Sequence, residues 1–334
     1  MAVTTGETFD SSDGASGNQA RRVVVQDRIF YYLTLASAVF VVVMLIGVMV
    51  SLVVGAWPAL EKFGPSFIWT QRWSPVKEIF GALSPIYGTI ITSVIAMIIG
   101  IPVSFGIAIF LTEICPDAIR RPIGVAIELL AGIPSIIYGL WGFFYLAPFM
   151  AAHIQGVWKF SLFGWNFALS LGGIPLIGGL FANSASGLNL FTAAVILAIM
   201  VLPFITSITR DVFQTVPTLL RESAYGMGMT TWEVVRHIVI PYCRVGLVGG
   251  IMLGLGRALG ETMAVTFVIG NSHAISASLF APATTISATI ANEFSEATTG
   301  VYTSSLILLG LVLSIITFAV LGLAKWLLVR GDIK

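Results

Sequence analysis

Long stretches without a charged residue are the feature that most constrains the fold of this chain. Charged residues bound five such intervals, each enclosing at least 28 uncharged residues: Arg28 to Glu61, Glu78 to Glu113, Glu128 to Lys159, Lys159 to Arg210 and Glu296 to Lys325. About 20 apolar residues cross a bilayer as a helix, so each interval has room for a membrane span. We predict an all-α, polytopic membrane protein with six transmembrane helices. The spans are expected near residues 30–56, 87–111, 126–146, 190–209, 247–269 and 304–329.

The composition agrees with a membrane protein and excludes several other classes. Of 334 residues, 57% are hydrophobic and only 10% are charged, whereas soluble domains carry about 25% charged residues. A net charge of +1 gives no excess of basic residues for nucleic acid to attract. The two cysteines, Cys115 and Cys243, do not make a disulfide framework, and no His/Cys cluster has the spacing of a metal site. We expect no metal and no cofactor.

The interval from Lys159 to Arg210 is long enough for two spans, so it decides the topology. Its first half carries six glycines between Gly164 and Gly187 together with Pro175, which favours an outer-face loop or a re-entrant segment. With six spans and a cytoplasmic N-terminus, twelve of the 17 basic residues lie on the cytoplasmic side, as the positive-inside rule requires. The outer side then holds Lys62, Arg72, Lys77 and Lys159.

This partition predicts a multi-pass protein of the cell membrane with both termini in the cytoplasm. Residues 1–28, rich in Gly, Ser, Thr and Asp, are expected to form a disordered cytoplasmic tail. Residues 29–334 are expected to form one transmembrane domain. No glycine is followed by lysine, so a phosphate-binding P-loop is absent and ATP hydrolysis would need another chain. An intramembrane enzyme would need paired catalytic groups, and Glu128 and Glu261 are the only candidates.

The loop at residues 210–246 is the longest expected on the cytoplasmic side. Pro217 suits the first turn of a short helix that Gly226 and Gly228 would end. Thr230 and Glu233 have the spacing of a capping box for a second short helix, which Pro241 is expected to stop. By itself this pattern is also compatible with a plain connector packed on its own helix bundle.

The same loop resembles the EAA motif of ABC importer permeases. Five residues match the motif in register, namely Glu222, Ala224, Gly228, Ile238 and Pro241, while Ser223 replaces an Ala and Ile240 replaces a Leu. The resemblance implies the MetI-like permease fold and a loop that docks on a dimer of ATP-binding subunits. It also implies a second permease subunit, related but different, and an extracytoplasmic binding protein as partners.

Three further stretches narrow the family. Residues 81–113, 128–142 and 254–265 resemble the permeases of high-affinity phosphate importers, the PstC type, and the likeness extends over roughly residues 28–334. It implies inorganic phosphate as the transported substrate and no covalent chemistry in this chain. A permease for another oxyanion, such as sulfate or molybdate, and the sister permease of the same phosphate complex are alternatives. A self-contained secondary transporter is an alternative from another class, but it would show two related halves and no ATPase-docking motif.

Two charged residues inside the fifth predicted span are candidates for an anion pathway. Arg257 and Glu261 are four residues apart and would share one helix face. A charge near the bilayer centre costs about 2.5–3.5 kcal/mol, so both should face protein or water. The planar guanidinium of Arg also suits phosphate. A structural ion pair between Arg257 and Glu261, or between Arg257 and Glu128, is the alternative.

Glycines on the same span predict close helix packing. Gly246, Gly250 and Gly254 have small-xxx-small spacing, as do Gly256 and Gly260. The stripe could serve packing within the bundle or contact with a second permease subunit. Gly-Ile-Pro sequences at residues 100–102 and 132–134 are expected to kink the second and third spans.

Overall fold

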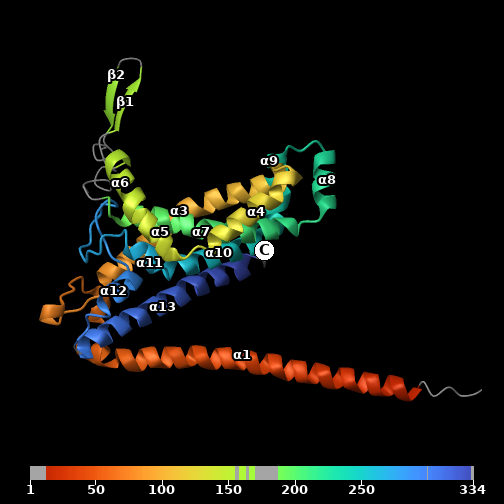
Figure 1. Cartoon of the computed structure of the whole chain (residues 1–334), viewed down its shortest axis with the longest axis horizontal. Helices are drawn as coiled ribbons and strands as arrows, with labels where there is room; N and C mark the ends of the chain where they lie inside the picture. The colour runs from red at the N-terminus through yellow and green to blue at the C-terminus, as the bar shows by residue number, and fades with distance from the viewer. Residues whose placement is uncertain (1–12, 155–157, 163–164, 170–186, 299, 332–334) are drawn as a thin grey trace, which may run out of the picture. The chain divides into compact units, whose positions relative to one another are not determined.

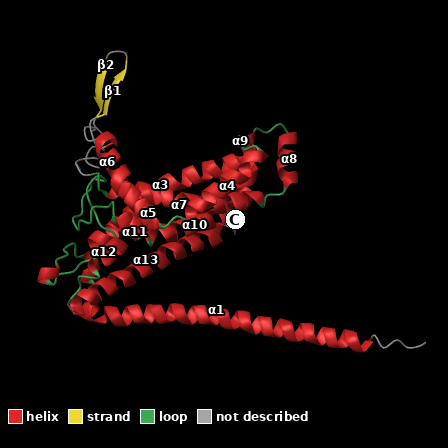
Figure 2. Ribbon diagram, in the orientation of Figure 1, coloured by secondary structure: helices red, strands yellow, loops and turns green. Residues whose placement is uncertain are grey.

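A computed structural model describes residues 13–154, 158–162, 165–169, 187–298 and 300–331. Most of these residues are helical, and the strands that the structure describes form one hairpin (Figure 2). The predicted all-α class is confirmed, with this hairpin as an addition. The longer elements are α1 (Asp13–Phe63), α3 (Leu83–Ile109), α4 (Asp117–Ala131), α5 (Ser135–Trp141), α7 (Leu190–Gln214), α8 (Thr218–Gly226), α10 (Ile240–Leu259), α12 (Ile286–Glu293) and α13 (Gly300–Gly331). The shorter ones are α2 (Ser66–Trp69), α6 (Ala147–Phe149), α9 (Thr231–Val234), α11 (Met263–Thr266) and a 3₁₀ turn at Pro75–Lys77.

The chain divides into two units, residues 1–54 and 55–334. The described part of the first unit is the helical run of α1, which continues into the second unit and ends at Phe63. Residues 13–28 belong to this helix, which corrects the expected disordered tail over 1–28; residues 1–12 lie outside the described part. The helix extends because each residue added to an existing helix gains a backbone hydrogen bond without a new nucleation step.

Six helices are long and apolar enough to cross a membrane, counted over the described residues. Their number agrees with the predicted six spans. They are Val24–Phe63, Leu83–Ile114, Ser135–His153, Leu190–Gln214, Thr231–Leu259 and Gly300–Trp326. The second, fourth and sixth overlap closely the intervals expected from the sequence, and the third and fifth differ in their bounds.

The third apolar helix begins at Ser135 and not near residue 126. Helix α4 ends at Ala131, Gly132 is its C-cap, and Pro134 directly precedes α5. Proline disfavours a helical conformation in the residue before it, so Ile133 cannot continue α4. The Gly-Ile-Pro sequence at residues 100–102 behaves differently, because α3 runs through Pro102 without a break.

The fifth apolar helix is a continuous run from Thr231 to Leu259, through α9, a π-helical turn at Val235–Val239 and α10. The sequence analysis expected Pro241 to stop the second short helix. In the structure the helix continues through Pro241. Proline lacks an N–H and crowds the carbonyl four residues earlier, and the widened π turn directly before α10 accommodates this loss. The helix ends at Leu259, ten residues earlier than expected.

The main core lies where α3, α7 and α10 pack together. Alanines such as Ala193 and Ala198 on α7 are fully buried there, beside Ile196, Val201 and Ile205. A second apolar cluster joins the end of α1 to α12 and α13 through Ala59, Phe80 and Leu306. Small side chains let the helices approach closely, as is typical of membrane bundles.

A hairpin interrupts the segment predicted as an outer-face loop. Strands β1 (Trp158–Leu162) and β2 (Trp165–Leu169) pair antiparallel, with Phe160 opposite Phe167. The remainder of the Gly-rich stretch, from residue 170 to 186, lies outside the described residues. The prediction of a loop or re-entrant segment there stays a prediction.

Candidate coupling surface and anion path

Helices α8 and α9 lie together at one end of the second unit, and α11 and α12 lie at its other end (Figure 1). Helix α8 starts after Pro217 and ends at Gly226. Gly228 follows in a left-handed conformation, with φ of 86°, which glycine adopts without steric cost. The predicted turn between two short helices is present.

The second helix begins with the predicted capping box. The Thr230 side chain accepts a hydrogen bond from the Glu233 N–H at 3.4 Å, and the Glu233 carboxylate accepts one from the Thr230 N–H at 2.8 Å. The Thr230 hydroxyl also donates to this carboxylate, at 2.8 Å. These bonds fix the start of α9 directly after the turn.

Helix α8 has an inner and an outer face. Ala224 is buried in an apolar cluster with Phe213, Val234 and Val239, and Ile238 packs against this cluster. Glu222 lies exposed on the outer face. Large apolar side chains of α8, its C-cap and α9 are also exposed: Leu219 is 70% exposed, Met227 71% and Trp232 61%. An exposed apolar patch next to charged residues is typical of a protein interaction site.

The five motif residues therefore separate into two groups. Ala224 and Ile238 hold the loop on its own helices, whereas Glu222, Gly228 and Pro241 are exposed. The exposed group, with the apolar patch beside it, is able to contact another chain.

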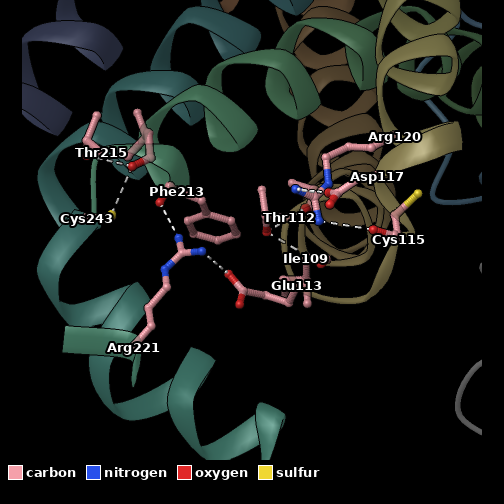
Figure 3. A network of polar contacts seen from close by, with 12 residues as sticks. Ile109, Thr112, Glu113, Cys115, Asp117, Arg120, Phe213, Thr215, Arg221 and Cys243 are labelled. Carbon is pink, nitrogen blue, oxygen red and sulfur yellow. Dashed lines mark hydrogen bonds and ion pairs between the residues drawn. The ribbon is translucent and has the colours of Figure 1, made fainter. Parts of the chain in front are cut away.

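An ion pair that sequence reasoning missed ties α8 to the end of the second span (Figure 3). Arg221 Nη1 lies 3.0 Å from Glu113 Oε1, and the two side chains are 19% and 4% exposed. The Arg221 Nη2 also donates to the main-chain carbonyl of Phe213. No sequence pattern connects residues 108 positions apart, although Glu113 stands out as the charge that closes an uncharged interval.

Arg257 and Glu261 do not share a helix face, contrary to the prediction. Arg257 lies in the last turn of α10, and Glu261 lies beyond its end, in the link to α11. A cation in the last turn is stabilised by the helix dipole. Glu261 Oε1 instead accepts a hydrogen bond from the Ala264 N–H of α11, at 3.3 Å.

The Arg257 side chain packs against α7. Its guanidinium carbon lies 4.3 Å from the centroid of the Phe204 ring, within the range of a cation–π interaction. Its Nε has no hydrogen-bond partner in the described part of the chain. Glu128 pairs with Arg210 at 2.6 Å, and among the described residues Arg257 forms an ion pair with neither of its two alternative partners, Glu128 and Glu261.

Hydroxyl groups gather beside Glu261. A narrow crevice is lined by Glu261 together with Thr89, Thr92, Ser93 and Thr285. The Thr92 hydroxyl is buried and has no partner among the residues that the structure describes. The crevice has no room for a water molecule, and its lining also includes Leu197, Ala258, Leu259 and Val265.

The glycine stripe of α10 packs within the bundle. A Cβ atom added at Gly246, Gly250 or Gly254 would lie 2.7–2.9 Å from side chains of α7. Glycine at these three positions allows the close approach of α7 and α10. For these positions the stripe therefore serves packing within the bundle. A Cβ atom added at Gly256 would lie 3.5 Å from Leu321 of α13, which is an ordinary contact distance.

Comparison with known proteins places this architecture in a family. Residues 106–329 match the model of the family described as binding-protein-dependent transport system inner membrane component. A phosphate transport system permease protein PstC from Mesorhizobium japonicum is 60% identical over 94% of this chain and 93% of its own length. The protein of the same name from Pasteurella multocida is 53% identical over 92% of both chains.

Solved structures support the fold alone. A chain of a bacterial ABC transporter that imports the acidic polysaccharide alginate aligns with a TM-score of 0.57 at 14% identity, over 93% of this chain and 99% of that one. A chain of the MetNI methionine ABC transporter aligns with a TM-score of 0.53 at 15% identity, over 78% of this chain and 99% of that one.

Proposed function

From the premise that this chain belongs to the family of binding-protein-dependent transport system inner membrane components, we propose that it is the permease subunit of an ATP-driven importer of inorganic phosphate. The assignment of phosphate as the substrate rests on the 60% identity, over nearly the full length, to a permease named for phosphate transport. The chain itself catalyses no covalent step. An ATP-binding subunit supplies the energy.

The ATP-binding subunit docks on the outer face of α8 and on α9. Glu222 and the exposed Leu219, Met227 and Trp232 offer an acidic group and large apolar side chains on these two helices. Gly228 sets the angle between the two helices through its left-handed backbone. A basic residue of the ATPase facing Glu222 would complete the contact.

The importer needs further partners that this chain does not contain. We propose a dimer of ATP-binding subunits, a second and different permease subunit, and an extracytoplasmic protein that delivers phosphate. The coupling helices lie in the cytoplasm. Both termini of the chain then lie there as well, in agreement with the twelve basic residues assigned to that side.

Arg257 and Glu261 form part of the anion path in this proposal. Arg244 is one of the basic residues assigned to the cytoplasmic side, and Arg257 lies 13 residues beyond it along one helix. At 1.5 Å per residue this separation is about 20 Å. Arg257 would therefore lie inside a hydrocarbon layer of about 30 Å. The unpartnered Nε of Arg257 and the hydroxyl of Thr92 are donors that a passing phosphate can use. Glu261 accepts hydrogen bonds and keeps the attraction for the anion moderate, which allows release.

Another oxyanion is the closest competing substrate, and uptake competition tests it. Cells without a phosphate permease of their own would receive this chain with its partner subunits, and labelled phosphate uptake would be measured. We expect excess unlabelled phosphate to abolish the signal and excess sulfate or molybdate to leave it unchanged. Inhibition by sulfate or molybdate as strong as by phosphate would contradict the proposed substrate.

A further inference from the structure

The ion pair between Glu113 and Arg221 joins the proposed coupling helix to the membrane-embedded part of the chain. Arg221 and Ala224 lie on the inner face of α8, whereas the neighbouring Glu222 is exposed on the outer face. Two adjacent residues of α8 therefore lie on different faces and have different roles. Glu222 is available to another subunit, and Arg221 holds the chain's own helices.

The Arg221 guanidinium has partners on two different elements, one joined by an ion pair and one by a hydrogen bond. One is the carboxylate of Glu113, in the π-helical turn Phe110–Ile114 that ends the second span. The other is the main-chain carbonyl of Phe213, in the last turn of α7. Figure 3 shows the guanidinium between Phe213 and Glu113. The hydrogen bond to Phe213 gives a direction and the ion pair with Glu113 gives a second point of attachment, so one planar group restrains α8 relative to both helices.

Apolar packing alone does not give this directional restraint. The cluster around Ala224, Phe213 and Val239 also holds the loop, but apolar contacts are non-directional and let surfaces slide. A buried ion pair is weak evidence for stability, because desolvation offsets most of its attraction. The pair is therefore better explained by a positional role than by a contribution to folding.

Glu113, the acidic member of the pair, lies in a π-helical turn. The extra residue in such a turn makes the hydrogen bonding less regular, and π turns occur frequently at functional sites. This turn directly precedes Cys115 and Pro116, after which α4 begins. A displacement of α8 would thus reach the end of the second span and the start of α4 together.

We propose that Arg221 and Glu113 are positioning residues that transmit the movement of α8, driven by the ATPase, into the second and fourth spans. The inference rests on the proposed function, because it assumes that an ATPase moves α8. Without the pair, α8 would still bind the ATPase through its outer face. Its movement would then be absorbed locally, and ATP would be hydrolysed with little transport.

The test measures phosphate uptake per ATP hydrolysed, using the complete importer in proteoliposomes. The variants are Arg221→Gln, Glu113→Gln and the charge exchange Glu113→Arg with Arg221→Glu. Values are normalised to the amount of assembled complex, so that reduced folding alone does not change the ratio. Lys62→Gln is the matched control, because Lys62 pairs with Glu78 at 2.8 Å in an exposed site outside α8.

We expect each single variant to keep the bound ATPase while uptake per ATP falls about tenfold or more, since a buried charge left without its partner weakens the connection strongly. The charge exchange should recover part of the ratio, and Lys62→Gln should leave it unchanged. A wild-type ratio in both single variants would overturn the proposal. If the single variants do not accumulate, Arg221→Lys decides: it keeps the charge but loses the fork, so a lowered ratio supports the proposal and a normal ratio overturns it.

The proposed function fails by a different result. If the wild-type complex itself takes up no phosphate, the substrate assignment is wrong, whatever the variants do. If the wild type imports phosphate and the variants match it, only the role of the ion pair is wrong.

Discussion

At the scale of single residues, the candidate sites depend on a few positions that the backbone conformation makes special. Gly228 is one, because its φ of 86° lies in the left-handed region. A Cβ atom there would meet no atom within 4 Å, so the constraint is conformational and not steric. Gly226, two residues earlier, also has open space but a helical backbone.

We predict that Gly228→Ala weakens ATPase binding, whereas Gly226→Ala does not. The left-handed conformation costs a non-glycine residue about 1–2 kcal/mol, which would shift the angle between α8 and α9. Gly228→Asn should have an intermediate effect, because Asn tolerates this conformation better. Co-purification of the ATP-binding subunit is the measurement. Equal binding by the Gly226 and Gly228 variants would show that the turn conformation is unimportant.

Arg257 is the second special position. We expect Arg257→Gln to abolish phosphate uptake while membrane abundance and bound ATPase persist, because the positive charge that attracts the anion is lost. Arg257→Lys should keep part of the activity, since the charge remains without the planar fork. Glu261→Gln should reduce uptake less than Arg257→Gln does. Normal uptake by Arg257→Gln would remove Arg257 from the path, and loss of the protein from the membrane would indicate a structural role instead.

At the scale of helices, the sequence predicted the number of spans and the pair of short helices at residues 218–234, but not every boundary. Uncharged intervals locate spans well because a charge in lipid is costly. They do not locate breaks inside an apolar run. The break before Ser135 and the end of α10 at Leu259 depend on Gly132, Pro134 and the Gly260–Thr262 link, whose effect is decided by packing.

Among the site residues, too, some interactions were predicted from the sequence and others were not. Local patterns predicted the turn at Gly228 and the capping box of Thr230 with Glu233, because these interactions join neighbours in the sequence. The Arg221–Glu113 and Arg210–Glu128 pairs join distant segments, so no local pattern could reveal them. The spacing rule for Arg257 and Glu261 failed because it assumed an unbroken helix.

The contact between α7 and α10 gives a prediction at this scale. A Cβ at Gly254 would lie 2.7 Å from Ile205, whereas one at Gly249 would meet no atom within 4 Å. Gly254→Ala should lower stability by about 1–3 kcal/mol through overpacking, and Gly249→Ala should be neutral or slightly stabilising. Thermal unfolding of the detergent-solubilised protein compares the two. A stability of the Gly254 variant at or above that of the Gly249 variant would contradict the packing.

At the scale of the whole molecule, the proposed topology assigns α8 to the cytoplasm and the loop between α2 and α3 to the outside. Val76 in that loop and Met227 beside α8 are both strongly exposed. In a background without Cys115 and Cys243, a cysteine at position 76 should react with an impermeant thiol reagent in intact cells. In cells that produce this chain without the ATP-binding subunit, which would otherwise cover Met227, a cysteine at position 227 should react only after the membrane is opened. The reverse pattern would contradict the six-span orientation.

ATP-driven phosphate import is the central claim, and uptake into proteoliposomes tests it most directly. The complete importer would be reconstituted with MgATP trapped inside and with labelled phosphate and the binding protein outside. We predict uptake only in vesicles that contain MgATP on the α8 side, and none when ATP is replaced by a sodium or proton gradient. Phosphate uptake that an ion gradient drives in the absence of ATP would contradict the account and identify a secondary transporter.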